Sequence, residues 1–180
     1  MKVMEAILNR RSIRRFTDKP IAKEDITSLL RAAMMGPTAR NCQEWEFVVV
    51  RDKATFKKIT SVHPYAQMMA QADCAIVVCG NTQREHAPGY WMADCGAATQ
   101  NILLAATALG IGSVWLGVYP NQDRMDGLSA ILGLPPHVKP LNIIALGYPN
   151  EKKEEVDRFD PAKIHLENGN IKRSRPARLL

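Results

Sequence analysis

The chain has 180 residues and a formal net charge of +6 at pH 7, and this length fits one domain with a substantial buried core. Residues 171–180 hold four of the basic side chains and no acid, so the rest of the chain carries only +2. A basic nucleic-acid-binding face is therefore not expected on the body of the protein. We expect one domain over residues 1–165, followed by a solvated basic tail over residues 166–180.

The four cysteines form no C-x-x-C pair and lie in apolar or helical contexts. Free thiols that behave as small apolar side chains are typical of a reducing compartment. Polar residues interrupt the N-terminal apolar pattern at Glu5, Asn9 and Arg10, so no signal peptide is expected. The longest strongly apolar run, residues 74–79, is far shorter than the roughly 20 residues of a membrane span. We expect a cytoplasmic protein with no membrane partner.

Apolar spacing and β-branched runs predict a mixture of helices and strands. Helices are expected over residues 1–10, 23–35, 53–60, 90–109 and 122–132, with a shorter one over 66–71. Strands are expected over residues 47–50, 74–80, 113–118 and 141–146. Because helices and strands do not alternate regularly, the expected class is α+β.

The predicted helix over residues 90–109 has apolar residues on nearly every face, and Asp94 is its one charged residue. A helix that is apolar all round must be buried on all sides. In a chain of this size, a second subunit would cover one face most easily. The pattern therefore predicts an obligate homodimer with a large interface.

Residues 10–16 (RRSIRRF) place four arginines and a serine near the end of the first predicted helix. Guanidinium groups are planar, permanently charged donors that suit bidentate binding of phosphate. Arginines near a helix C-terminus also complement the helix dipole without any ligand. Both interpretations remain open from this stretch alone.

A second polar segment follows the second predicted helix, over residues 36–43 (GPTARNCQ). Pro37, Thr38 and Asn41 can fix an irregular backbone. The side-chain amides of Asn41 and Gln43 offer the donors and acceptors that a flavin ring edge would require. The alternative is a turn that ends the helix through local side-chain hydrogen bonds.

The common catalytic signatures are absent from the sequence. The four histidines show no metal-ligand spacing, and no G-x-S-x-G or Walker motif occurs. Gly110 and Gly112 follow a predicted helix and are not followed by a third glycine at Trp115, which argues against a Rossmann site. We therefore expect no metal and no catalytic side chain, and a bound cofactor that carries the chemistry.

These segments together are similar to a known family. The chain resembles the FMN-dependent nitroreductase family from Met4 to about His165, because six landmarks occur in the family's order. They are residues 10–14, 36–43, 100–106, 110–117 and 145–149, and the late Arg158. The resemblance implies a central, mostly antiparallel sheet flanked by helices, in a homodimer whose two FMN sites are each built from both chains.

The resemblance also implies which residues bind FMN: Arg10, Arg11, Ser12, Arg14, Pro37, Thr38, Ala39, Asn41, Gln43, Leu116, Gly117 and Arg158. By similarity, Arg10, Arg11 and Ser12 hold the phosphate and ribityl chain, and Arg158 adds to the phosphate. Arg14 reaches the N1/O2 edge of the ring. The partner chain's segment from Pro37 to Asn41 lines the ring, and the backbone of Leu116 and Gly117 lies near N5.

Three positions depart from the family's usual pattern. Thr38 stands where serine is common, and Glu44 stands where a proline usually precedes the tryptophan. Val156 stands where a lysine often precedes Arg158 by two residues. Lys152 or Lys153 could supply that missing charge.

The implied function is an oxidoreductase that takes reducing equivalents from NADH or NADPH and passes them through FMN to a small-molecule acceptor. Nitroaromatics, quinones and flavins are the acceptors that the family suggests, with ping-pong kinetics because both substrates use one ring face. The alternatives are an FMN-binding or FMN-sensing dimer without turnover, and a specialised family member such as a reductive dehalogenase. The polar segment over residues 82–88 is short, which does not favour a large lid.

Overall fold

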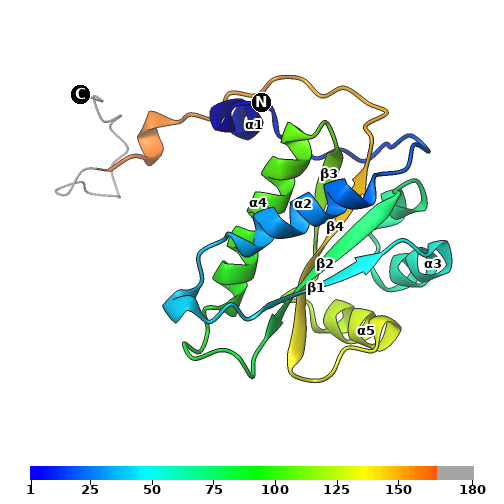
Figure 1. Ribbon diagram of the computed structural model, residues 1–180, viewed down its shortest axis with the longest axis vertical. Coiled ribbons are helices and arrows are strands. Elements are labelled where there is room, and N and C mark those ends of the chain that lie inside the picture. The colour runs from blue at the N-terminus through cyan, green and yellow to red at the C-terminus, as the bar shows by residue number, and fades with distance from the viewer. Residues whose placement is uncertain (166–180) are drawn as a thin grey trace.

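The computed structural model of the protein describes residues 1–165, and the predicted tail over 166–180 lies outside the described residues (Figure 1). The helices are α1 (Val3–Asn9), α2 (Lys23–Met34), α3 (Lys53–Val62), α4 (Trp91–Ala108) and α5 (Gln122–Leu132). The 3-10 turns are η1 (Ala39–Asn41), η2 (Gln67–Ala70) and η3 (Pro161–Lys163). The strands are β1 (Trp45–Val50), β2 (Cys74–Asn81), β3 (Gly112–Gly117) and β4 (Val138–Gly147).

The strands form one sheet in the order β1-β2-β4-β3, and every neighbouring pair is antiparallel. The predicted α+β class with an antiparallel sheet and flanking helices is therefore confirmed. Element bounds differ from the predictions by at most three residues, and the largest difference is at β4, which begins at Val138 instead of residue 141. Pro140 is tolerated inside β4 because it pairs with Cys79 where the register between β2 and β4 shifts.

Helices cover both faces of the sheet, with α2 and α4 on one side and α3 and α5 on the other (Figure 1). Along β2, Ile76 and Val78 pack in the cluster with α2 and α4, whereas Ala75 and Val77 pack in the cluster with α3 and α5. This alternation follows from the two-residue period of a strand. Both faces of β2 are buried, which explains its unbroken apolar sequence.

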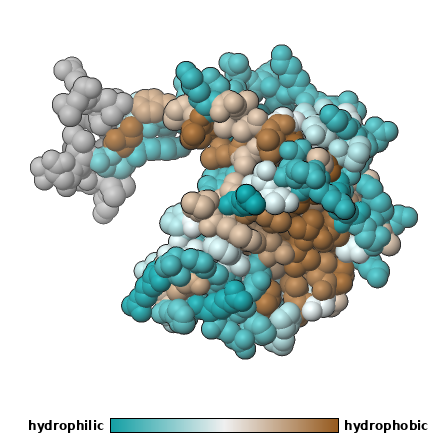
Figure 2. Space-filling model, viewed as in Figure 1, coloured by the Kyte–Doolittle hydropathy of each residue, from teal (hydrophilic) through white to brown (hydrophobic). Residues whose placement is uncertain are grey.

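Helix α4 is largely covered within its own chain, because α2 and the sheet pack against it. The apolar helix that lacks cover is α1, where Val3, Met4, Ile7 and Leu8 are between 44% and 73% exposed and only Ala6 is buried. Figure 2 shows apolar side chains at the surface in this region. The homodimer stays a prediction. The exposed apolar surface that a second subunit could cover lies on α1 more than on α4.

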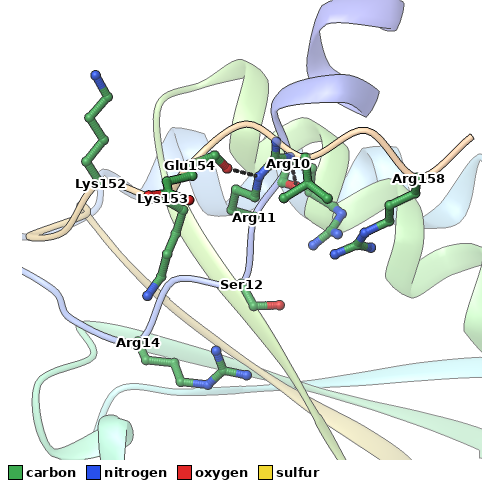
Figure 3. Close-up of a pocket in the computed structure, with 9 residues that line it drawn as sticks. Arg10, Arg11, Ser12, Arg14, Lys152, Lys153, Glu154 and Arg158 are labelled. Atoms are coloured by element: carbon green, nitrogen blue, oxygen red, sulfur yellow. Dashed lines mark hydrogen bonds between the residues drawn. The ribbon is translucent and has the colours of Figure 1, made fainter.

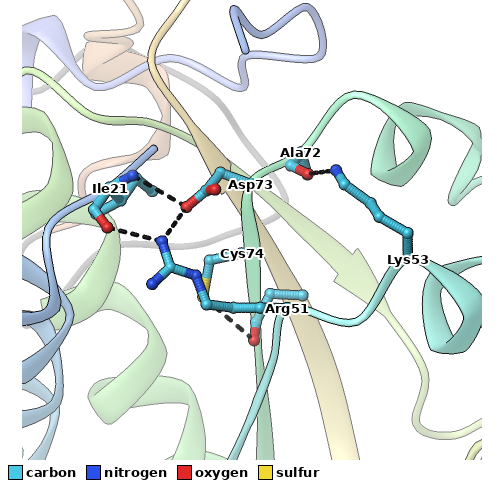
Figure 4. A network of polar contacts seen from close by, with 7 residues as sticks. Ile21, Arg51, Lys53, Ala72, Asp73 and Cys74 are labelled. Carbon is cyan, nitrogen blue, oxygen red and sulfur yellow. Dashed lines mark hydrogen bonds and ion pairs between the residues drawn. The ribbon is translucent and has the colours of Figure 1, made fainter. Parts of the chain in front are cut away.

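A polar network ties the start of α2 to the sheet (Figure 4). Asp73 Oδ2 accepts hydrogen bonds from Ile21 N (3.0 Å) and Arg51 Nη2 (2.5 Å). Arg51 Nη2 also donates to Ile21 O (2.7 Å), and Lys53 Nζ donates to Ala72 O. The segment between α1 and α2 is thereby fixed where β1 ends and β2 begins.

The four cysteines are free thiols, as the sequence predicted. Cys74, Cys79 and Cys95 are buried, and burial raises the pKa of the Cys74 and Cys79 thiols to about 12. These thiols stay protonated at neutral pH and pack as apolar groups. Within residues 1–165, no helix is both long enough and apolar enough to cross a membrane.

Candidate functional site

The arginine-rich segment is extended and is not part of a helix, because α1 ends at Asn9. Ile13 N donates to Ser113 O at 2.9 Å, and Ser12 bridges to Ser113 on β3. In extended backbone, successive side chains point to opposite sides. Figure 3 accordingly shows Arg10, Ser12 and Arg14 pointing to the same side of the segment, and Arg11 pointing away from them.

Two glycines allow this segment to lie close to the sheet. A Cβ atom on Gly112 would lie 2.9 Å from Ile13 Cγ2, and one on Gly147 would lie 2.7 Å from Phe16 Cγ. Real Cβ atoms do not come this close to other carbons, so any side chain at either position would displace the segment. Glycine is therefore needed at both positions to seat the arginine segment.

A cavity of about 570 Å³ opens beside the segment, and its lining is strongly basic (Figure 3). The lining residues are Arg10, Arg11, Ser12, Arg14, Lys152, Lys153, Glu154, Val156 and Arg158. The guanidinium groups of Arg10 and Arg158 lie side by side. Burial, Arg158 and Arg11 together lower the pKa of Arg10. Within residues 1–165 no acidic side chain pairs with Arg10 or Arg158, so an anion would relieve their repulsion.

Arg11 is held by backbone carbonyl groups. Its Nη1 donates to Leu8 O (2.7 Å) and Arg10 O (2.9 Å), and its Nε donates to Glu154 O (2.9 Å). Arg11 thereby connects the last turn of α1 to the segment that carries Arg158. Its expected contact with a phosphate stays a prediction, and the structure adds a positioning role.

Glu151 fixes the other side of the same cavity. Its Oε1 accepts from Arg14 N (2.6 Å) and Arg15 N (3.2 Å), and its Oε2 lies 2.7 Å from Lys153 Nζ. These contacts, with the Arg14 backbone first, lower the pKa of Glu151. The Lys152 side chain points away from Ser12, whereas that of Lys153 points toward Arg14 (Figure 3). Lys153 is the better candidate for the charge that Val156 does not supply.

A second cavity of about 420 Å³ shares Arg14 with the first and is more apolar. Its lining residues are Arg14, His63, Tyr65, Gln67, Met68, Trp115, Leu116, Gly117 and Arg124. His63 Nε2 lies 2.9 Å from Gly117 O, and Arg124 Nη1 donates to the same oxygen at 3.1 Å. Burial lowers the pKa of His63, which favours the neutral ring donating from Nε2.

Sequence reasoning found Arg14, Leu116 and Gly117 but not the other residues of this second cavity. The histidine spacing in the sequence predicts no metal site and gives His63 no other role, and no motif marks Tyr65 or Arg124. These residues come from the segment after α3 and from α5, so no spacing in the sequence connects them. A side chain cluster formed only by tertiary packing leaves no local signal.

The two cavities together fit FMN. A phosphate suits the basic cavity beside Arg10, Ser12 and Arg158. A planar ring suits the neighbouring cavity beside Met68 and Leu116, which has more apolar than polar surface. Because Arg14 lines both cavities, one ligand with an anionic end and a flat end can occupy them together.

The second predicted segment, Pro37 to Gln43, lies at the other end of α4 (Figure 1). Ala39 N donates to Asp94 Oδ2 in the first turn of α4 at 2.7 Å, whereas Arg11 lines a cavity with Thr107 near its last turn. Asp94 and Thr107 are 13 residues apart on α4, which separates the two segments by about 20 Å along the helix. One chain therefore does not bring the two predicted halves of the site together.

The turn from Thr38 to Gln43 has an unusual backbone held by local hydrogen bonds. Arg40, Asn41 and Gln43 have positive φ angles of 52°, 55° and 50°. Gln43 N donates to Thr38 Oγ1 (3.1 Å), and Gln43 Nε2 donates to Asn41 Oδ1 (2.8 Å). The local side-chain bonds of the alternative interpretation are thus present. A contact of this turn with a flavin stays a prediction.

Comparisons with known proteins agree with this architecture. The model of the nitroreductase family matches residues 7–62 and 55–148. A protein of Methanothermobacter thermautotrophicus, provisionally named an NADH dehydrogenase/NAD(P)H nitroreductase, is 48% identical over 93% of this chain and 87% of its own length.

Two solved structures are also similar to this chain. A crystal structure from Parabacteroides distasonis, with the same provisional name, has a TM-score of 0.88 at 41% identity and covers 92% of this chain and 97% of its own. A nitroreductase from Desulfovibrio desulfuricans, also provisionally named and crystallised with FMN, has a TM-score of 0.78 at 30% identity. It covers 88% of this chain and 92% of its own. The chain therefore belongs to the nitroreductase family.

Proposed function

We propose that the protein is an NAD(P)H-dependent flavin oxidoreductase that binds FMN across its two neighbouring cavities. The observation that carries the proposal is the pair of Arg10 and Arg158, which lack an acidic partner among the described residues and line a cavity that shares Arg14 with a second, more apolar one. When bound, FMN supplies the redox chemistry, accepting a hydride from NADH or NADPH and passing reducing equivalents to an acceptor. The protein supplies binding, orientation and charge.

Each contact residue has a distinct task in this proposal. Arg10, Ser12 and Arg158 bind the phosphate, with Arg11 holding α1 and the segment of Arg158 together. Arg14 places a positive charge between the two cavities, where it stabilises negative charge on a reduced ring. His63 and Arg124 fix the Gly117 carbonyl, so that the backbone of Leu116 and Gly117 forms a rigid wall.

We further propose that a second copy of the chain completes the site. The large apolar side chains of α1 are exposed, and the segment from Pro37 to Gln43 lies near the opposite end of α4 from the arginine segment. In a homodimer, that segment of the partner lines the ring beside Leu116 and Gly117. Sedimentation analysis tests the dimer, and a monomer that keeps its FMN would overturn it.

The acceptor side of the reaction follows from the lining of the cavities. Among residues 1–165, no acidic side chain lines the second cavity, which is open, and solvent can supply the protons. NAD(P)H and the acceptor use the same space in turn, which gives ping-pong kinetics. An open site fits the reduction of many different nitroaromatics and quinones.

The free thiols of the protein fit the reducing conditions of the cytoplasm, where we place the protein.

The visible absorption spectrum of the purified protein tests the proposed function. We expect a yellow protein whose flavin absorption is bleached by NADH or NADPH without oxygen and restored by a quinone or nitroaromatic. Parallel double-reciprocal lines would support the ping-pong order, and intersecting lines would contradict it. A flavin that binds but is not bleached would instead indicate an FMN-binding dimer without turnover.

A further inference from the structure

Glu44 is a buried acid that the proposed function does not use. It directly precedes β1, and its side chain is fully buried. Its backbone oxygen accepts from Asn81 N at 2.7 Å, which fixes the residue at the end of the β1–β2 ladder. Within residues 1–165, no other residue donates a hydrogen bond to either carboxyl oxygen of Glu44, and the neighbouring group to which a protonated Glu44 can donate is the Asp94 carboxylate. Burial of an ionised carboxylate that accepts no hydrogen bonds costs free energy, so this site favours the protonated acid.

Two other carboxyl groups lie around Glu44 at the start of α4, and both have backbone donors. Glu85 Oε1 accepts from Tyr90 N (2.9 Å) and Trp91 N (3.2 Å). Asp94 Oδ2 accepts from Ala39 N (2.7 Å). Three neighbouring carboxylates cannot all keep their charge, and the group without donors is the one that takes up a proton.

The charges around Glu44 agree with this assignment. Burial is the main cause that raises the pKa of Glu44 to about 7, and Asp94 and Glu85 raise it further. Cys95 follows Asp94 on α4, and its thiol is neutral because burial and the nearby Glu44 raise its pKa. Nearby cations have other partners, since Arg40 donates to His86 O (3.2 Å) and Arg84 lies 3.7 Å from Glu46.

Asp94 in turn holds the strained turn from Thr38 to Gln43. Arg40, Asn41 and Gln43 all have positive φ angles, a conformation that costs energy for residues other than glycine and persists only when its surroundings impose it. The hydrogen bond from Ala39 N to Asp94 anchors this turn to α4. An ionised Glu44 beside Asp94 would repel the anchoring carboxylate.

We propose that Glu44 is a positioning residue: as a neutral acid it keeps Asp94 in place, and Asp94 holds the Thr38–Gln43 turn. Loss of the Glu44 proton at raised pH loosens the turn. The effect on FMN rests on the proposed function, which gives this turn to the partner's flavin site. The coupling of Glu44 to the turn does not depend on FMN at all.

The test compares the wild type with Glu44→Gln, which stays neutral at every pH and can still donate to Asp94. Backbone amide exchange of residues 38–43, expressed as protection factors, is measured in the flavin-free protein between pH 6 and 8.5. Wild-type protection should fall above pH 7, by up to about 30-fold at pH 8.5, which is the factor for a group titrating 1.5 units below that pH. Protection in Glu44→Gln should not change with pH. Glu46→Gln, which changes a half-buried neighbour on β1, should behave as the wild type.

Wild-type protection that is constant over this range, or that falls equally in Glu44→Gln, would overturn the proposal. If Glu44→Gln does not fold, infrared spectroscopy of the wild type decides, because a carboxylic-acid band must persist at pH 6 and disappear above pH 8. FMN titration at pH 8.5 separates the two proposals. Weaker FMN binding by the wild type than by Glu44→Gln supports both. A turn that loosens without any change in FMN affinity keeps the role of Glu44 and removes the turn from the flavin site.

Discussion

Replacement of Arg10 by alanine tests the phosphate site directly. Arg10 is half-buried next to Arg158 and has no acidic partner within residues 1–165, so its guanidinium is available to an anion. A hydrogen bond to a charged group contributes about 1.5–3 kcal/mol, which corresponds to an FMN affinity about 10- to 150-fold weaker in Arg10→Ala. The flavin-free protein should not be destabilised, because the substitution removes repulsion between like charges.

Titration of flavin-free protein with FMN, followed by flavin fluorescence, measures this affinity. Thermal unfolding gives a second measurement. At an FMN concentration 100 times the wild-type Kd, bound FMN stabilises the wild type by about 2.7 kcal/mol, and the weaker binding should lower the melting temperature of loaded Arg10→Ala by about 3–9 °C. Arg15→Ala is the matched control, because the exposed Arg15 lines neither cavity. An FMN affinity of Arg10→Ala within threefold of the wild type would refute the phosphate assignment.

Three further substitutions test the supporting contacts. Arg11→Ala should speed trypsin cleavage at residues 152–153, because it frees their segment from α1; an unchanged rate would show that Arg11 does not hold it. Asp73→Ala should reduce the free energy of unfolding by about 1–3 kcal/mol in urea denaturation, because Arg51 and Ile21 lose their acceptor; an unchanged midpoint would contradict this. The folded state lowers the pKa of His63. As the pH falls below about 6.5, His63 therefore takes up a proton in the unfolded chain before it does so in the folded protein, and acidification reduces the free energy of unfolding. The difference in urea midpoint between pH 7.5 and pH 5 should be smaller in His63→Gln, and an equal difference would exclude His63 as its source.

The order and type of the helices and strands could be predicted because apolar periodicity is local. The strand over 74–80 was predictable from its unbroken apolar run, which reflects burial on both faces. The start of β4 was not, because Lys139 and Pro140 interrupt the apolar pattern. The strand is extended by the pairing of residues 138–140 with residues 79–81 of β2, and pairing is a tertiary property.

The apolar sequence of α4 predicts a second subunit, but in the structure the helix with exposed apolar side chains is α1. Composition shows that a helix is apolar, but it does not show which neighbours cover it. Helix α2 and the sheet cover α4, whereas the large apolar residues of α1 stay exposed. The two halves of the predicted site also lie at opposite ends of α4 (Figure 1), which is an independent reason to expect a second chain.

The arginine segment shows how local geometry decides which side chains can bind a ligand. At a helix end, residues 10 and 14 would share one face with residue 11, at three- and four-residue spacing. In the extended backbone that the structure shows, Arg10, Ser12 and Arg14 share a side, and Arg11 turns back to carbonyl oxygens. The pairing of Ser12 with β3 imposes this backbone, and Gly112 leaves room for it. Gly112 and Gly147 belong to the later motifs over residues 110–117 and 145–149. By leaving room for the segment over residues 10–16, they determine which of its arginines face the cavity.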